Sequence, residues 1–192
     1  MPPKKSLMDM VTSLFELQFV GPPKKIYVGR GGYFYLDYSI EEWKQLTLLY
    51  VLRLIPPFVS HIVVLCQDDG KVMALANLGS EISRQVYAVQ NKSDEYDRTA
   101  DTNRFCACGG VLITPDACWE IDSSNISIVV VYDVPTSKMK NGQQLGLRKI
   151  LGQNKVVIYF MKCINYPKLA DFILKDIPWI NLSKLPVNFE FE

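Results

Sequence analysis

Two apolar runs separated by an acidic, glycine-containing turn sequence constrain the fold of this chain more than any other feature. The runs cover residues 59–66 and 72–78, and Asp68-Asp69-Gly70 lies between them. An Asp-Gly pair between two apolar runs is typical of a β-hairpin with a tight turn. The sequence therefore predicts that these two runs are neighbouring antiparallel strands.

Other short β-prone runs extend this pattern. Residues 26–28 and 33–36 flank Gly29-Arg30-Gly31-Gly32, which predicts a second hairpin around a glycine-rich turn. Three further strands are predicted, at residues 105–113, 126–132 and 156–161. The second of these three is rich in valine, which favours a buried and central position.

The clearest helix start is Ser39-Ile40-Glu41-Glu42, which fits a capping box. The helix is predicted to run to about Ile55, and Pro56-Pro57 ends it. Because it is apolar on nearly every side, we expect it to be the central core helix. Further helices are predicted at residues 7–17, 143–151 and 167–178.

The fold class that follows is α+β. With 192 residues and 48% hydrophobic side chains, the chain is long enough for one core. Hairpins mixed with separate helices predict a single domain with a largely antiparallel sheet, the central apolar helix and further packed helices. We expect a basic, amphipathic arm and helix over residues 1–25, the domain over 26–192, and an exposed polar loop at 90–104.

The charge is unevenly distributed along the chain. Residues 134–170 contain seven cations and no Asp or Glu, which leaves 14 basic against 20 acidic residues elsewhere. A basic stretch of this kind favours phosphate-rich partners, either RNA or an anionic membrane surface. An ordinary solvated face is the alternative, although such faces usually mix both signs. The predicted anion-binding residues are Lys4, Lys5, Lys24, Lys25, Arg30, Lys138, Lys140, Arg148, Lys149, Lys155 and Lys162.

The sequence offers no strong catalytic or metal-binding pattern. Cys106, Cys108 and Cys118 lack the paired spacing of a structural zinc site, and His61 is the only histidine. A structural, hydrogen-bonded role is the default for His61, and buried packing is the default for the cysteines. The glycines at 29–32 match neither nucleotide-binding motif, GxGxxG or GxxxxGK[ST]. We therefore expect no metal, no cofactor, no small-molecule substrate and no enzymatic activity.

The sequence also bears on localisation. The N-terminus, Met1-Pro-Pro-Lys-Lys, lacks the apolar run of a secretory signal, and the cysteine count is odd. The apolar stretch 46–58 contains Arg53 and Pro56-Pro57, and is too short to cross a bilayer core of about 30 Å. We expect a reducing compartment, no transmembrane segment and, at most, peripheral membrane contact.

The order of these pieces resembles that of rhabdovirus matrix proteins over residues 30–165. The resemblance is carried by Met1-Pro-Pro-Lys-Lys, the helix after Tyr33 to Tyr38, Cys106-Ala-Cys108-Gly-Gly-Val-Leu-Ile-Thr-Pro and Ile126-Ser-Ile-Val-Val-Val-Tyr-Asp133. It implies a self-associating, non-enzymatic viral assembly protein of the virion and host cytoplasm, which links ribonucleoprotein to an acidic membrane. The Pro-Pro-x-Tyr budding motif of many such proteins is missing, since Lys24-Lys25 follow Pro22-Pro23.

A second resemblance leads to an alternative function. Residues 27–46 resemble the strand-then-helix end of transcription-coactivator-type single-strand-binding domains. That resemblance implies a single-strand nucleic-acid-binding module in which aromatic and basic side chains on a β-surface hold bases and backbone. The residues that would form this surface are Tyr33, Phe34, Tyr35, Lys24, Lys25 and Arg30.

Overall fold

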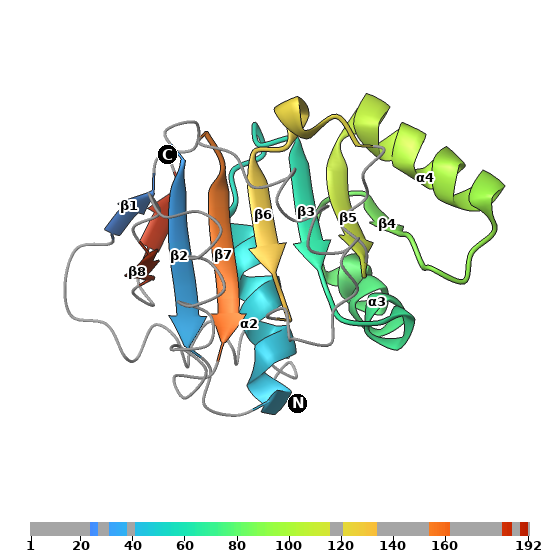
Figure 1. The fold of residues 1–192 in the computed structure, drawn as a ribbon. Coiled ribbons are helices and arrows are strands. Elements are labelled where there is room, and N and C mark those ends of the chain that lie inside the picture. Colours follow the sequence, from blue (N-terminus) through green and yellow to red (C-terminus); the bar gives the residue numbers. More distant parts are fainter. Residues whose placement is uncertain are drawn as a thin grey trace, which may run out of the picture.

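Seven parallel strands form the central sheet of this protein, in the order β4-β5-β3-β6-β7-β2-β8 (Figure 1). The structure is a computed structural model that describes residues 24–26, 31–37, 41–115, 121–133, 154–161, 182–185 and 189–191. The strands are β2 Gly32–Asp37, β3 His61–Leu65, β4 Val86–Ala88, β5 Gly110–Thr114, β6 Ile128–Val131, β7 Val156–Met161 and β8 Leu182–Lys184. A separate two-stranded parallel sheet joins β1 Lys24–Ile26 to β9 Phe189–Phe191.

The expectation of a largely antiparallel sheet is wrong, because every described strand pair is parallel. The strands at the centre are buried along their whole length, as in β6 and β7. Continuous apolar runs of this kind are typical of parallel strands whose two faces are both covered. The predicted strands at 126–132 and 156–161 are confirmed, and β6 has the expected central position between β3 and β7.

Both faces of the sheet carry a hydrophobic core. The helices are α2 Glu41–Leu54, α3 Asp69–Ala76 and α4 Glu95–Cys108, with short 3-10 turns at Asn77–Glu81 and Ser123–Asn125. Residues of α2 and α3 pack on the face that contains Ile62 and Val64, whereas Phe105 of α4 packs on the face that contains Val63 and Leu65. Alternate residues of β3 thus serve opposite cores, as the twofold strand period requires.

Helix α2 confirms the predicted core helix in its position and its end before Pro56-Pro57. Its buried apolar positions are Leu48, Leu49, Val51 and Leu52, followed by Ile55, and most of these lie on one face of the helix, toward the sheet. The opposite side is open, since Trp43 is 41% exposed. The side chains of the expected capping box, Ser39 and Glu42, lie outside the described residues, as do the helices predicted at 7–17, 143–151 and 167–178.

The hairpin predicted at Asp68-Asp69-Gly70 is wrong, because these residues begin helix α3. Asp68 is the N-cap, and its carboxylate accepts a hydrogen bond from the Lys71 amide at 3.0 Å. Val72 and Leu75, three residues apart, face the core. An aspartate ahead of an apolar run satisfies a helix N-terminus as well as it begins a turn, and the burial of the second run favours the helix.

Helix α4 replaces two predicted features, the polar loop at 90–104 and the start of a strand at 105. Asp94 caps this helix by accepting from the Asp97 amide at 2.8 Å. Only Thr102 and Phe105 of α4 are buried, so the apolar periodicity is too weak to indicate a helix from the sequence. Gly109, at a φ of 73°, ends the helix, and β5 begins with Gly110.

The second predicted hairpin is also wrong. Strand β1 pairs with β9, while β2 lies between β7 and β8. Each flanking run therefore finds its partner more than a hundred residues away in the sequence instead of across the glycine-rich turn. The expected boundary at residue 25 falls within β1, and the division into arm and domain remains a prediction.

Candidate functional site at the carboxyl edge of the sheet

The carboxyl ends of β3 and β6 meet at the point where the chain changes direction in the sheet. From β3 the chain continues through α3 to β4, which lies on the β5 side of β3 in the sheet. The strand that follows β6 is β7, which lies on the opposite side (Figure 1). Ligands of open parallel α/β sheets bind in the crevice outside the carboxyl ends of strands at such a switch point. This position makes the residues after β3 and β6 the candidate functional site.

Asp133, two residues after β6, is the centre of this site. Its Oδ1 atom accepts from Lys44 Nζ of α2 at 2.8 Å and from Lys71 Nζ of α3 at 2.9 Å. Its Oδ2 atom accepts from the backbone amide of Gln67, just after β3, at 2.8 Å. The Lys44 ammonium also lies 4.2 Å from the ring centroid of Tyr132, within the range of a cation–π contact.

The charges of the three side chains do not cancel. Burial raises the pKa of Asp133, but the hydrogen bonds and positive charges of Lys44 and Lys71 outweigh it and hold that pKa below its usual range. Asp133 is therefore ionised at neutral pH. Two ammonium groups share one carboxylate, so this trio carries a net positive charge. Lys71 is 37% exposed, whereas Lys44 is 3% exposed, so only Lys71 can reach a ligand directly.

The two aspartates at the start of α3 are engaged by backbone groups. Asp68 caps α3, and Asp69 accepts from the amides of Asn91 and Lys92 at 2.8 and 3.2 Å. These contacts fix the loop after β3 to the loop after β4. The exposed residues on this edge are Gln67, Asp68, Gly70, Asn91 and Lys92.

Cys66, the first residue after β3, is not a nucleophile. Burial, with the charges of Asp133 and Asp68 adding to it, raises the pKa of this thiol to about 12. The thiol therefore stays protonated at neutral pH, and thiolate is the reactive form. Cys66 is 2% exposed and packs in the core. The expectation of buried packing is wrong for Cys108, which is exposed on α4, and Cys106 on the same helix is only partly buried.

His61 lies at the opposite, amino edge and has the structural role expected of it. Its ring nitrogens lie 2.8 Å from Ser60 Oγ and 3.1 Å from the Cys106 carbonyl oxygen. Its ring also meets the Phe105 ring edge-on. Within the part of the chain that the structure describes, no group of three His, Cys, Asp or Glu side chains could hold a metal ion. Cys118 lies outside that part.

The structure describes few of the basic residues predicted to bind anions. Lys24 and Lys25 belong to β1. Lys155 is 7% exposed, and its ammonium donates to the Ile126 carbonyl at 3.2 Å. Burial lowers the pKa of Lys155, and this residue is not part of an exposed basic surface. The remaining predicted residues lie outside the described ranges: Lys4, Lys5, Arg30, Lys138, Lys140, Arg148, Lys149 and Lys162.

The residues that the alternative hypothesis assigned to an aromatic β-surface do not form an exposed surface. Tyr33, Phe34 and Tyr35 lie on β2, which is flanked by β7 and β8 within the sheet. Tyr33 is 6% exposed, and Phe34 and Tyr35 are partly buried against opposite cores. Their rings serve packing, because both faces of a parallel sheet are covered.

The sequence analysis did not single out Asp133, Lys44, Lys71 or Gln67 as site residues. One signal for Asp133 was present, since it follows an apolar run that was predicted to be a central strand. Polar residues just after such strands gather at the carboxyl edge once the sheet is parallel. Because the sheet was expected to be antiparallel, the position of Asp133 after a strand was not interpreted as a site signal.

This architecture, a parallel sheet with helices on both faces, is also found in solved domains of DEAD-box proteins. It matches the C-terminal domain of the DEAD-box protein Dbp5 with a TM-score of 0.69, at 18% sequence identity, over 82% of this chain and 91% of that one. S. cerevisiae Dbp5 bound to RNA and ADP BeF3 matches with a TM-score of 0.67 and 21% identity, over 85% of this chain and 43% of that one.

Sequence comparison leads to the same group of proteins. ATP-dependent RNA helicase FAL1 of Mycosarcoma maydis is 27% identical over 160 residues, which cover 82% of this chain and 39% of the relative. The chain therefore spans about two fifths of the length of this curated relative. No family model matches the chain.

These comparisons correct three expectations. A viral matrix protein is the wrong class, because the relatives and structural neighbours are helicases and helicase domains. The expectation of no enzymatic activity is contradicted, since those relatives are ATP-dependent enzymes by name. A virion location and a viral ribonucleoprotein or membrane partner have no support. Among the described helices, none has the length and apolar character needed to span a bilayer.

Proposed function

We propose that this chain is an RNA-binding RecA-type domain of a helicase-like protein, and that RNA binds along the carboxyl edge of the sheet. The observation that carries this proposal is the joint likeness, in sequence and fold, to ATP-dependent RNA helicases over about four fifths of the chain. A neighbour of the same fold is bound to RNA. This likeness favours the nucleic-acid alternative of the sequence analysis over its leading hypothesis.

The carboxyl edge has the chemistry for a phosphate backbone. Lys71 is partly exposed and shares Asp133 with Lys44, so a phosphate oxygen can take one lysine contact without leaving the carboxylate unpaired. Gln67 and Asn91 supply exposed amide groups on the same edge. Amide and ammonium side chains are common phosphate and sugar contacts in nucleic-acid complexes.

In this proposal, ATP hydrolysis is an activity of the whole helicase-like protein, to which this chain contributes. The sequence contains no GxxxxGK[ST] motif, and its one Gly-Lys pair, Gly70-Lys71, is followed by Val72. We infer that ATP phosphates are held mainly by residues outside this chain. In this account the chain contributes RNA contacts to an enzyme whose nucleotide-binding residues belong to a second domain.

Fluorescence anisotropy with labelled single-stranded RNA tests the proposal across a salt series. The test variant is Lys71→Ala, and the matched control is Arg104→Ala, an exposed cation on α4 near the opposite edge. Loss of one phosphate contact should reduce the slope of log K against log salt by about 0.7. The control should keep the wild-type slope.

Two outcomes would contradict the proposal. The first is an absence of RNA binding at low salt by a chain that melts cooperatively. The second is an equal loss of affinity in Lys71→Ala and Arg104→Ala, which would indicate nonspecific attraction. Circular dichroism of each variant shows that the fold is retained.

A further inference from the structure

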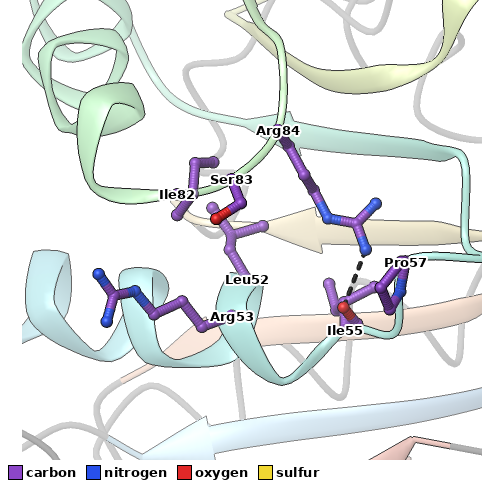
Figure 2. A pocket seen from close by; sticks show the side chains of 7 residues that line it. All are labelled: Leu52, Arg53, Ile55, Pro57, Ile82, Ser83 and Arg84. Atoms are coloured by element: carbon purple, nitrogen blue, oxygen red, sulfur yellow. Dashed lines mark hydrogen bonds between the residues drawn. The ribbon is translucent and has the colours of Figure 1, made fainter.

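A pocket of about 320 Å³ lies on the amino side of the sheet, away from Asp133. It is formed where α2 ends and where the chain approaches the start of β4 (Figure 2). Its lining residues are Leu52, Arg53, Ile55, Pro57, Ile82, Ser83 and Arg84. The pocket therefore lies at the other end of α2 from Lys44, and on the opposite edge from the proposed RNA site.

The base of this pocket is apolar. Leu52, Ile55 and Ile82 provide aliphatic surface, and Pro57 is exposed beside them. The next residue, Phe58, is 69% exposed, which is unusual for a phenylalanine. Phe58 does not line the pocket, but it directly follows Pro57, which does, and exposed apolar residues of this kind are common where another protein binds.

Two arginines line the same pocket, and no carboxylate is among its lining residues. Arg53 is 43% exposed and donates from Nε and Nη2 to the Glu81 carbonyl at 3.0 and 2.7 Å. Its distance to the Glu81 carboxylate is 3.8 Å, and that carboxylate is itself 55% exposed. This ion pair is weak, because the charged atoms are far apart and both side chains are exposed to water. Arg53 can therefore pair with another anion.

Arg84 is the more informative of the two. Its guanidinium donates to the Ile55 carbonyl at 2.8 Å (Figure 2). It also donates to the carbonyls of Pro56 and Val59. In the described part of the chain, no carboxylate forms an ion pair with it. The carbonyls at the carboxyl end of α2 offset part of this charge, and an acidic ligand would supply the countercharge that the described residues do not.

We propose that this pocket binds an acidic peptide segment of a partner protein, with one apolar side chain in the pocket and a neighbouring carboxylate on Arg53 or Arg84. The volume accommodates one large side chain. The guanidinium groups of Arg53 and Arg84 lie on different sides of the pocket, so an acidic residue flanking that side chain can meet one of them (Figure 2). Phosphate or nucleic acid would satisfy the arginines but leave the apolar base uncovered. This proposal is independent of the RNA site, because the two surfaces lie on opposite edges of the sheet.

Peptide selection tests the proposal directly, because the proposed ligand is a short peptide segment and the selection does not require the partner protein to be known. A random peptide library displayed on phage is selected on the full chain, and the enriched peptides are synthesised and titrated. The two test variants are Ser83→Trp, which places an indole at the pocket, and Arg53→Glu, which reverses an exposed charge. The control is Arg104→Glu on α4, since its side chain is 71% exposed.

The expected result is a shared pattern of one apolar residue next to Asp or Glu. Affinity should fall at least tenfold in Ser83→Trp and in Arg53→Glu, and stay within twofold in Arg104→Glu. The proposal is overturned if no peptides enrich, if the enriched peptides lack acidic residues, or if they bind both test variants normally. It is also overturned if single-stranded RNA competes with the peptides. Thermal melting of each variant ensures that losses do not reflect unfolding.

Discussion

Asp133 and Lys71 are joined by a 2.9 Å ion pair although they lie 62 residues apart in the sequence. The pair ties the chain after β6 to helix α3, which follows β3, and so bridges the two strands where the chain changes direction. The same carboxylate holds Lys44 of α2 and the Gln67 amide. One side chain thus fixes three elements at the carboxyl edge.

Replacement of Asp133 by asparagine should destabilise the fold. Lys44, 3% exposed, would keep its charge without a carboxylate, and breaking a buried pair by removal of one partner costs about 3 kcal/mol. Urea denaturation measures this loss. The matched control is Asp101→Asn, which removes an exposed ion pair with Arg104 and should change the free energy of unfolding by less than about 1 kcal/mol. Equal effects of the two changes would contradict the role given to Asp133.

The stability that Asp133 provides should depend on pH. Because its pKa is lower in the folded than in the unfolded chain, its contribution is complete above the unfolded value of about 3.9 and is lost as pH falls through the folded pKa. The difference in unfolding free energy between wild type and Asp133→Asn should therefore shrink in acid. Denaturation curves collected from neutral pH down to about pH 3 test this. A difference in unfolding free energy that grows as the pH falls would contradict this prediction.

Tyr159→Phe should stabilise the protein. The Tyr159 hydroxyl is buried in the central strand β7 and has no hydrogen-bond partner among the described residues, and burial raises the pKa of this phenol far above its usual value. A buried hydroxyl without a partner costs about 1 kcal/mol or more, which phenylalanine avoids. Thermal unfolding measures the gain, with Tyr96→Phe as a control because Tyr96 is 81% exposed. Destabilisation by Tyr159→Phe would mean that the hydroxyl does have a partner.

Gly110→Ala should destabilise the protein by about 2 kcal/mol. Gly110 has a φ of 124°, and a Cβ atom there would lie 2.5 Å from the Gln85 carbonyl oxygen. That carbonyl accepts from the Val111 amide, so it cannot move without loss of β4–β5 pairing. Gly70→Ala is the control, since Gly70 lies in helix α3 without a positive φ. Chemical denaturation that ranks the two variants in the reverse order would contradict this.

The sequence predicts individual elements of this fold better than their arrangement. The apolar runs that became β3, β6 and β7, and the proline-terminated helix α2, were identified correctly. Apolar runs indicate that a strand is buried, but they do not specify its partner. The Asp68-Asp69-Gly70 pattern suits both a hairpin and a capped helix, and only the packing of Val72 and Leu75 decides between them.

The candidate site was harder to predict than the fold, for a related reason. Lys44 and Asp133 are 89 residues apart and meet only after the parallel sheet has formed. Lys155 was predicted to belong to the site and does not. It lies in the acid-free stretch that suggested a basic surface, yet it is buried and its ammonium donates to the Ile126 carbonyl. Charge counted along a sequence does not show which cations reach the solvent.

Ultraviolet crosslinking of single-stranded RNA to the chain, followed by mass spectrometry of the crosslinked peptides, tests the central claim most directly. The account predicts crosslinks on peptides of the carboxyl edge, at residues 66–71 and 90–92, and their loss in Lys71→Ala. Crosslinks concentrated instead at the amino edge, around Arg53 and Arg84, would contradict both the RNA site and the peptide-binding role proposed for that pocket.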